Sequence, residues 1–323
     1  MITAARRIPV TLLTGYLGAG KTTLLNRILS EKHGKRYAVV VNEFGEVGID
    51  SDLVIDADEE VVEMNNGCVC CNVRGDLIRI LGGLMKRAER FDGILLETTG
   101  LADPAPVAQT FFVDDDIRRR TKLDAIVTVV DAHHFLEQVE SAPEAREQIA
   151  FADIGLVNKC DLASADQLAK VEARIRSINP FAKLYNVERC HVDITDILDR
   201  GAFDLDRILE IEPGFLEHAH SHGHDDEISS LSLVSRQPLA PARFLDWVQD
   251  VTQRFGPDLL RMKGVVAMQD DDDRFVVQAV HMLVEGNHQR AWRKNEPRHS
   301  RVVLIGRNLP GDVLRQGFEV CQA

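Results

Sequence analysis

Apolar and polar positions alternate along roughly the first two hundred residues in a repeating order of short and long segments. Short apolar runs are typical of buried strands, and longer stretches with apolar residues at helical spacing are typical of amphipathic helices. This alternation predicts an α/β domain with a mostly parallel, doubly wound sheet. The expected strands are residues 8–13, 37–41, 93–97, 125–131, 154–158 and 181–187, and the expected helices are 21–33, 74–90, 132–150 and 165–178.

The pattern changes after about residue 213, where a polar, histidine-rich stretch without apolar periodicity is typical of a linker. Beyond it, strands and helices no longer alternate strictly, which favours a smaller α+β domain. We expect strands at 228–234, 259–268, 274–284 and 301–305, and helices at 241–255 and 310–321. The predicted organisation is an α/β domain over 1–210, a linker over 211–227 and a C-terminal domain over 228–323.

Composition narrows the classes of function. The chain has 323 residues, 45% hydrophobic and 28% charged, with a net charge of −13, which is typical of a soluble globular protein. No long basic stripe is present, so we expect no nucleic-acid partner. There is no apolar run of membrane-spanning length and no apolar signal-peptide core at the N-terminus, so we expect no membrane partner and a cytoplasmic location.

A glycine-rich segment, Gly-x-x-x-x-Gly-Lys-Thr, follows the first expected strand and opens the first expected helix. Its glycines allow successive backbone N–H groups to point at phosphate oxygens, aided by the helix N-terminus. Lys21 is expected to reach the β- and γ-phosphates, and the Thr22 hydroxyl to bind Mg²⁺. The predicted nucleotide-binding residues here are Gly15, Gly18, Ala19, Gly20, Lys21, Thr22 and Thr23.

Glu97 ends a second apolar strand, and the sequence Glu-Thr-Thr-Gly gives it acid-x-x-Gly spacing with Gly100. We expect Glu97 either to hold the hydration shell of Mg²⁺ or to orient the attacking water, and the Gly100 N–H to sense the γ-phosphate. The predicted catalytic residues are therefore Lys21, Thr22 and Glu97.

A third motif, Asn158-Lys159-Cys160-Asp161, follows a later apolar strand. A carboxylate at Asp161 would accept hydrogen bonds from N1–H and the 2-amino group of guanine, and adenine offers neither donor. Asn158 is expected to brace the loop and the base edge, and the stem of Lys159 to cover the base plane. The motif therefore favours GTP over ATP.

Three cysteines, Cys68, Cys70 and Cys71, lie within four positions of one another. Three soft thiolates suit Zn²⁺ or Cu(I) and leave a fourth position open, as a transient carrier requires. In an extended segment Cys71 would point away from the other two thiols, so a turn is needed for all three to bind one ion. A redox pair or buried free thiols are the alternatives. The other cysteines, Cys160, Cys190 and Cys321, are expected to be inert packing residues.

An acidic segment over residues 42–50 follows the second expected strand. In P-loop GTPases this region tends to become ordered around Mg²⁺ and the γ-phosphate. Since it contains no threonine, we expect Glu43, Glu46 or Asp50 either to serve Mg²⁺ or to complete the thiolate site, with a plain acidic turn as the alternative. Our magnesium assignment is Thr22, Glu43 and Glu97.

Together these motifs, with Asn-Gly-Cys-Val-Cys-Cys at 66–71 and Glu-Thr-Thr-Gly-Leu-Ala-Asp-Pro at 97–104, resemble the CobW-type P-loop GTPases, and in particular their YjiA-like subgroup. Arg-Met-Lys-Gly at 261–264 and Val-Leu-Ile-Gly at 303–306 extend the resemblance into the second domain. The resemblance implies GTP hydrolysis coupled to the handling of a transition metal, commonly zinc, and its transfer to a client metalloprotein. It also implies Cys68, Cys70 and Cys71 as the metal ligands.

The linker histidines His218, His220, His222 and His224 are expected to chelate Zn²⁺, Ni²⁺ or Co²⁺ weakly, with a merely solvated linker as the alternative. His133, His134 and His281 are expected to be structural, the last within a strand. The expected cofactors are GTP, Mg²⁺ and Zn²⁺, with Co²⁺ or Ni²⁺ as alternatives, since thiolate sites bind according to availability as much as geometry.

The favoured function is therefore a GTP-hydrolysing metallochaperone. A zinc reservoir or sensor, a protein that supplies cobalt or iron for cofactor or nitrile hydratase maturation, and a redox-switched GTPase are the competing hypotheses. The sequence does not identify the client protein. Nor does it determine the oligomeric state, which nucleotide or metal binding would control.

Overall fold

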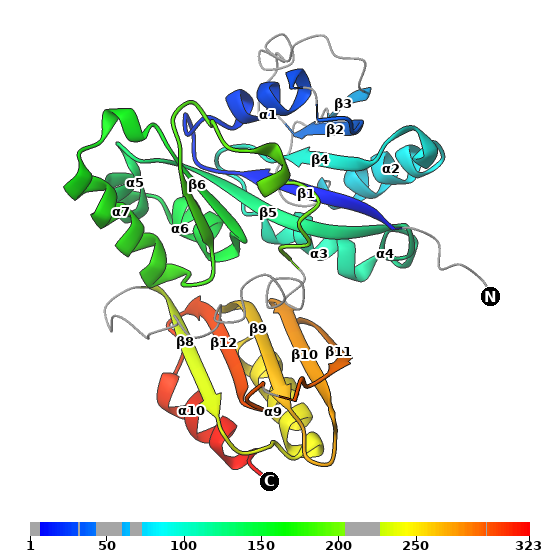
Figure 1. Ribbon diagram of the computed structural model, residues 1–323, viewed down its shortest axis with the longest axis vertical. Coiled ribbons are helices and arrows are strands. Elements are labelled where there is room, and N and C mark those ends of the chain that lie inside the picture. The colour runs from blue at the N-terminus through cyan, green and yellow to red at the C-terminus, as the bar shows by residue number, and fades with distance from the viewer. Residues whose placement is uncertain (1–6, 32, 43–59, 65–72, 204–226, 295) are drawn as a thin grey trace. The chain divides into compact units, whose positions relative to one another are not determined.

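The computed structural model describes residues 7–31, 33–42, 60–64, 73–203, 227–294 and 296–323 (Figure 1). The chain divides into two compact units, one formed by residues 1–174 and 182–204 and the other by 175–181 and 205–323. The predicted linker lies mostly outside the described residues, so the boundaries at 210 and 227 remain predictions.

The first unit is built on a seven-stranded sheet in the order β3-β2-β4-β1-β5-β6-β7. All of its paired strands run parallel, which confirms the predicted α/β class. Strands β1, β4 and β6 are buried at every position, because helices cover both faces of a parallel sheet. The strands are β1 Ile8–Thr14, β2 Tyr37–Asn42, β3 Glu60–Met64, β4 Gly93–Glu97, β5 Thr121–Asp131, β6 Ile154–Asn158 and β7 Lys183–Asn186.

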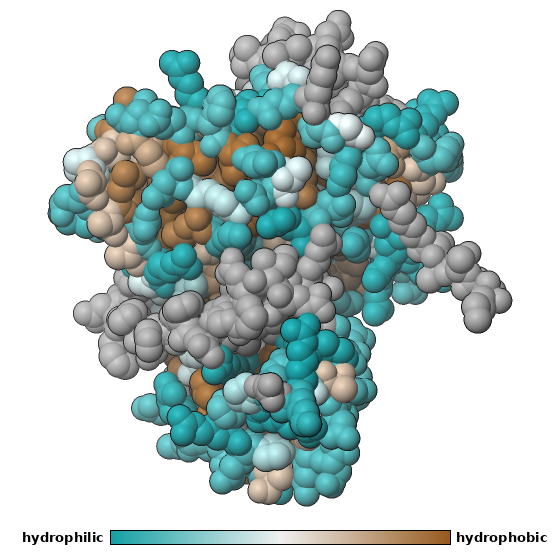
Figure 2. Space-filling model, in the orientation of Figure 1, coloured by the Kyte–Doolittle hydropathy of each residue, from teal (hydrophilic) through white to brown (hydrophobic). Residues whose placement is uncertain are grey.

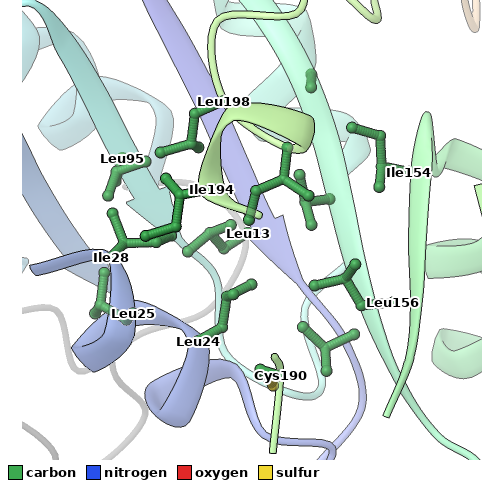
Figure 3. Close-up of a cluster of buried hydrophobic side chains, with 14 of the residues drawn as sticks. Leu13, Leu24, Leu25, Ile28, Leu95, Ile154, Leu156, Cys190, Ile194 and Leu198 are labelled. Atoms are coloured by element: carbon green, nitrogen blue, oxygen red, sulfur yellow. The ribbon is translucent and has the colours of Figure 1, made fainter. Parts of the chain in front are cut away.

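One face of this sheet is covered by the first helix and by the segment that follows β7. Figure 3 shows Leu24, Leu25 and Ile28 of α1 packed with Leu13 of β1 and with Ile194 in one buried apolar cluster. Helices α3, α4 and α6 contact β5. The helices are α1 Lys21–Ser30, α2 Val73–Met85, α3 Ala105–Val113, α4 Asp115–Arg120, α5 Phe135–Ser141, α6 Pro143–Phe151 and α7 Ala165–Ile178, with short 3₁₀ turns η2 Ala88–Arg90, η3 Cys160–Leu162 and η4 Ile194–Asp196.

The first unit differs from the prediction in several elements. The helix expected over 132–150 is two helices, because Pro143 forces Ala142 into an extended conformation with φ −122° and ψ 112°. Strand β3 and the helices α3 and α4 were not predicted, and α2 ends at Met85 rather than at residue 90. Short elements carry too few periodic positions to be distinguished from loops.

The second unit is a five-stranded antiparallel sheet in the order β11-β10-β9-β12-β8 with two helices, which confirms the predicted α+β class. Side chains of both helices, including Phe244, Trp247 and Phe318, form one apolar cluster with the sheet. The elements are β8 Ile228–Ser235, α9 Pro241–Phe255, β9 Leu259–Ala267, β10 Asp273–Val280, β11 Leu283–Ala291, β12 Ser300–Arg307 and α10 Gly311–Val320.

The strand expected over 274–284 is in fact a hairpin. His281, with a left-handed φ of 52°, lies in the turn between β10 and β11 and not within a strand. Its Nδ1 lies 3.3 Å from the carbonyl oxygen of Gly256. Leu283 and Val284 at the start of β11 continue the apolar run of β10 across the two-residue turn, which explains why one long strand was predicted.

Most of the described surface in view is hydrophilic, as Figure 2 shows. Single apolar side chains such as Leu17, Leu101 and Met282 are nevertheless exposed. Among the described residues, no helix combines the length and the apolar character needed to cross a membrane.

Candidate functional site

The loop between β1 and α1 is shaped by three glycines with positive φ, Gly15 at 142°, Gly18 at 73° and Gly20 at 116°. At Gly15 a side chain is also excluded by space, because a Cβ would lie 2.3 Å from the carbonyl oxygen of Val129 on β5. Nζ of Lys21 donates a hydrogen bond to the Gly15 carbonyl over 2.9 Å, so the lysine spans the loop that it closes.

Helix α1 begins directly after this loop. Its N-cap is Gly20, which offers no side-chain acceptor, and its first turn contains no acidic residue. Backbone N–H groups at such a helix start suit a phosphate, because the first turn of a helix offers them no intrahelical acceptor and they carry a partial positive charge. Thr22 in this first turn is partly buried, whereas Thr23 is exposed.

The segment after β4 lies against the same loop. Glu97 pairs with Leu13 in register and is only 6% exposed. Thr98 continues the contact, since its backbone N–H donates to the Leu13 carbonyl over 3.0 Å. Gly100 approaches the loop so closely that a Cβ there would lie 2.8 Å from the backbone nitrogen of Leu17. The structure therefore brings the acid-x-x-Gly motif and the phosphate loop together, as the sequence predicted.

Gln148 of α6 is a residue of this site that sequence reasoning missed. Its buried Nε2 donates to the carbonyl oxygens of Gly100 and Ala102, at 3.1 and 3.3 Å. The backbone of Gln148 is itself tied to β5, because the Thr128 hydroxyl donates to its carbonyl over 3.0 Å. The one sequence signal for this role is that the glutamine falls on the apolar face of a predicted helix, since a buried polar side chain needs hydrogen-bond partners.

Asn158, at the end of β6, joins three segments. Its Nδ2 donates to the carbonyl of Ala19 over 2.9 Å, and its Oδ1 accepts from the backbone N–H of Cys190 at 2.8 Å. The next residue, Lys159, is left-handed with φ 62°, and Asp161 is exposed to solvent. The Asn158–Asp161 motif, for which base recognition was predicted, and the phosphate loop are thus neighbours at the carboxyl edge of the sheet.

Cys190 lies beneath this junction, packed with Leu24 and Leu156 in the cluster of Figure 3. Its thiol donates to the Gly20 carbonyl at 3.4 Å, and burial raises the pKa of the thiol to about 11. A thiol with this pKa is almost fully protonated at neutral pH, as expected for an inert packing cysteine. The part that its backbone takes in holding Asn158 was not foreseen from the sequence.

The site offers two oxygen donors that could hold a magnesium ion. The hydroxyl of Thr22 and the carboxylate of Glu97 belong to segments that meet at one edge of the sheet, and Mg²⁺ prefers oxygen ligands. Within the described residues, no three His, Cys, Asp or Glu side chains gather in a way that could hold a metal ion. The predicted ligands Cys68, Cys70, Cys71, Glu43, His218, His220, His222 and His224 lie outside the described residues, as do Glu46 and Asp50.

Two family models match the chain. The CobW/HypB/UreG nucleotide-binding domain matches residues 9–186, and the C-terminal domain of the cobalamin synthesis protein CobW matches residues 228–322. The first match spans more than half of the chain and contains every described residue of the site apart from Cys190.

Several relatives match over nearly the full length. The zinc chaperone YjiA of Escherichia coli is 35% identical over 316 residues, which cover 96% of this chain and 98% of the relative. The zinc-regulated GTPase metalloprotein activator 1 of Schizosaccharomyces pombe is 34% identical, with 94% and 83% covered. The crystal structure of zinc-bound YjiA GTPase superposes with a TM-score of 0.80 at 30% identity, over 98% of this chain and 100% of that one.

Proposed function

The chain is a P-loop GTPase of the CobW/HypB/UreG family, and from this premise we propose that it is a metallochaperone that binds Zn²⁺ through Cys68, Cys70 and Cys71 and delivers it to a client metalloprotein. The relatives named as zinc chaperones support zinc as the cargo. Cobalt and nickel remain the alternatives for a thiolate site.

The observation that carries this proposal is the position of the cysteine segment in the chain. Strand β3 ends at Met64, four residues before Cys68, and α2 begins at Val73, two residues after Cys71. Because β3 runs parallel to β1 and β4 in one sheet, its carboxyl end lies at the edge that also carries the phosphate loop and Glu97. Strand β3, which precedes the cysteine segment in the sequence, therefore ends at the nucleotide edge of the sheet.

This shared edge supports a coupling between the two ligands. If GTP changes the affinity for zinc by some factor, zinc must change the affinity for GTP by the same factor. A nucleotide cycle could then load and release the metal in turn, which a passive zinc binder cannot do.

The roles of the nucleotide-site residues follow from the geometry. Lys21 would move from the Gly15 carbonyl to the β- and γ-phosphates, while the N–H groups at the start of α1 bind phosphate oxygens. Thr22 and Glu97 would hold Mg²⁺, which neutralises charge that develops on the phosphates. Alternatively, Glu97 would orient the attacking water, and the N–H of Gly100, which lies against the phosphate loop, would sense the γ-phosphate.

Selection of guanine would come from the Asn158–Asp161 motif. Asp161, exposed in this structure, is available to accept from the two guanine donors, and Asn158 fixes the motif to the phosphate loop. A bound adenine would cover the carboxylate without offering those donors, a penalty on the order of 1–3 kcal/mol for a polar group buried without a partner.

The proposal is tested by titrating Zn²⁺ into the full-length protein bound to a non-hydrolysable GTP analogue, bound to GDP, or free of nucleotide. We expect the zinc affinity to differ between these states, and Cys70→Ala to remove the tight site. Cys321→Ala is the matched control, because its thiol is buried in the second unit and should leave zinc binding unchanged. Equal affinities in all three nucleotide states would contradict coupled delivery.

A zinc reservoir is the second candidate, and it is favoured by the four linker histidines. A zinc-bound variant of YjiA in which one glutamate and two cysteines are replaced by alanine also matches this fold, with a TM-score of 0.80. That relative thus holds zinc without its full native set of side chains. If the reservoir hypothesis holds here, deletion of residues 217–227 removes most bound zinc while Cys70→Ala removes little.

We further propose the domain limits 1–210, 211–227 and 228–323, a cytoplasmic location, and no nucleic-acid or membrane partner. The net charge of −13 supports the last point, because nucleic acids and anionic membranes would repel the protein.

A further inference from the structure

Asp131 is a buried carboxylate that the mechanism above does not use. It ends β5 and is paired in register with Asn158, the first residue of the base-recognition motif. Its side chain is only 3% exposed, and a carboxylate in such a place needs donors on both oxygens. It therefore either stabilises the fold locally or acts on the motif beside it.

The donors around Asp131 divide between its two oxygens. Oδ1 accepts from the backbone N–H groups of His133 and His134, at 3.0 and 3.3 Å. Oδ2 accepts from Nδ1 of His134 at 3.1 Å and from Nζ of Lys159 at 2.7 Å. One oxygen thus caps the turn after β5, and the other holds the lysine of the base-recognition motif.

Lys159 is constrained at both ends by this arrangement. Its backbone is left-handed, with φ 62° and ψ 36°, and its ammonium group is fixed on Asp131. Between these points the stem remains accessible, since the side chain as a whole is 32% exposed. A free lysine stem would lose much rotamer entropy on packing against a ligand, and one that is already fixed loses little.

The partner of the lysine is itself held firmly. The N–H of Ala132 donates to the Asn158 carbonyl over 2.9 Å, which ties the residue after Asp131 to the motif. Nε2 of Gln167 on α7 donates to the carbonyls of Ala132 and His133, at 3.3 and 2.8 Å. The carboxylate therefore sits on a rigid support, which a positioning residue requires.

We propose that Asp131 is a positioning residue for guanine-nucleotide binding. Its carboxylate holds Lys159 so that the lysine stem forms one wall of the base pocket before the nucleotide binds. This inference rests on the proposed assignment of Asn158–Asp161 as the guanine-binding motif. It adds a determinant of nucleotide affinity that touches neither base nor phosphate.

Asp131→Asn separates the two roles of the carboxylate. The amide oxygen can still accept from the N–H groups of His133 and His134, so the turn keeps its cap. The amide NH₂ group would then face Nζ of Lys159, and two donors cannot bond to each other. The variant therefore frees the lysine while the two backbone hydrogen bonds of the cap stay in place.

The experiment measures the dissociation constants of GDP and of pyrophosphate for the full-length protein and for Asp131→Asn, Lys159→Met and the double variant. Taking the ratio of the two constants within each variant cancels any change in the folded fraction. We expect each single variant to weaken GDP binding about tenfold, because a side chain that is no longer fixed loses rotamer entropy when it packs on the base, and to leave pyrophosphate binding unchanged. The double variant should also weaken GDP about tenfold, because both changes remove one interaction.

Asp124→Asn is the matched control. Asp124 is a fully buried carboxylate on the same strand, but it binds Thr11, Arg200 and Gly201, so the ratio for GDP and pyrophosphate should not move. The positioning role alone would be overturned if the losses of GDP affinity in the two single variants multiplied in the double variant. It would also be overturned if Asp131→Asn left the GDP affinity unchanged while Lys159→Met lowered it. A neutral Lys159→Met would overturn it through the base-site assignment on which it rests.

Discussion

Asn158 and Ala19, which are 139 positions apart in the chain, are joined by a hydrogen bond of 2.9 Å from the side-chain amide to the backbone carbonyl. The same amide accepts from the N–H of Cys190, and its side chain is only 2% exposed. The segments proposed to bind base and phosphate are therefore one connected unit before any nucleotide arrives.

Asn158→Ala should destabilise this unit. The change leaves the Ala19 carbonyl and the Cys190 N–H buried without their partner, at about 1–3 kcal/mol for each group. We expect the free energy of unfolding in urea to fall by several kcal/mol in all, and the affinity for GDP to fall with it. Asn186→Ala is the control, because that amide bonds to Glu172 at the surface and should change stability by less than about 0.5 kcal/mol. Equal effects of the two variants would contradict the connection.

Gly100→Ala should impair GTP hydrolysis. Its methyl group would meet the backbone nitrogen of Leu17 at 2.8 Å, so the segment and the phosphate loop must move apart. Overpacking of this kind typically costs about 1–3 kcal/mol of stability. The rate of phosphate release should fall, and the melting temperature should fall modestly. Gly82→Ala in α2 meets nothing within 4 Å and should leave the rate unchanged. A Gly100→Ala enzyme of normal rate would show that this close approach is not needed.

Gln148→Met should affect hydrolysis more than nucleotide affinity. The methionine fills the same space but leaves the carbonyls of Gly100 and Ala102 without their donor, at about 1–3 kcal/mol for each. Because neither carbonyl belongs to the phosphate loop or the base motif, the dissociation constant of GDP should stay within about threefold of the native value. Single-turnover hydrolysis and GDP titration together test this. Gln249→Met, on an exposed face of α9, is the control.

Cys190 and Cys321 should resist alkylation in the native protein. Burial raises the pKa of both thiols to about 11, so at pH 8 only about one thiol in a thousand is the reactive thiolate. Iodoacetamide labelling followed by mass spectrometry should find both cysteines unmodified at pH 8 and modified in guanidinium. Rapid labelling of Cys190 in the native state would contradict its burial.

The raised pKa of Cys190 also determines how the stability of the protein changes with pH. A thiol with a raised pKa stays protonated in the folded protein over a range in which the unfolded chain ionises. The stability due to Cys190 is therefore fully present below about pH 8.5 and is lost as the pH rises towards 11. The free energy of unfolding should fall more steeply over this range in the native protein than in Cys190→Ala.

Much of the fold follows from the sequence because the central strands are long apolar runs. Strands β1, β4 and β6 were predicted within one residue, since buried parallel strands have no polar alternation to confuse them with loops. Strand β3 has only five residues, two of which are glutamates, so it lacks such an apolar run and was not predicted. The break at Pro143 was predictable from the residue itself, and only the length of the surrounding helical pattern concealed it.

The site was predictable where one continuous motif supplies it. The phosphate loop, Glu97 and Asn158 each lie in short, recognisable segments, and the structure places those segments side by side. Gln148 and Asp131 were missed because the partners that matter, Gly100 and Lys159, lie in loops 48 and 28 positions away in the chain. No local pattern encodes a bond that exists only after the chain has folded.

Gln148 also sets limits on motion. The segment after β4 is held at its start by Thr98 on the Leu13 carbonyl and at its end by Gln148 on Gly100 and Ala102. A buried amide cannot exchange these bonds for water, so releasing the segment means losing them together. Release of the segment would therefore be cooperative, because the bonds from Gln148 to Gly100 and to Ala102 would be lost together.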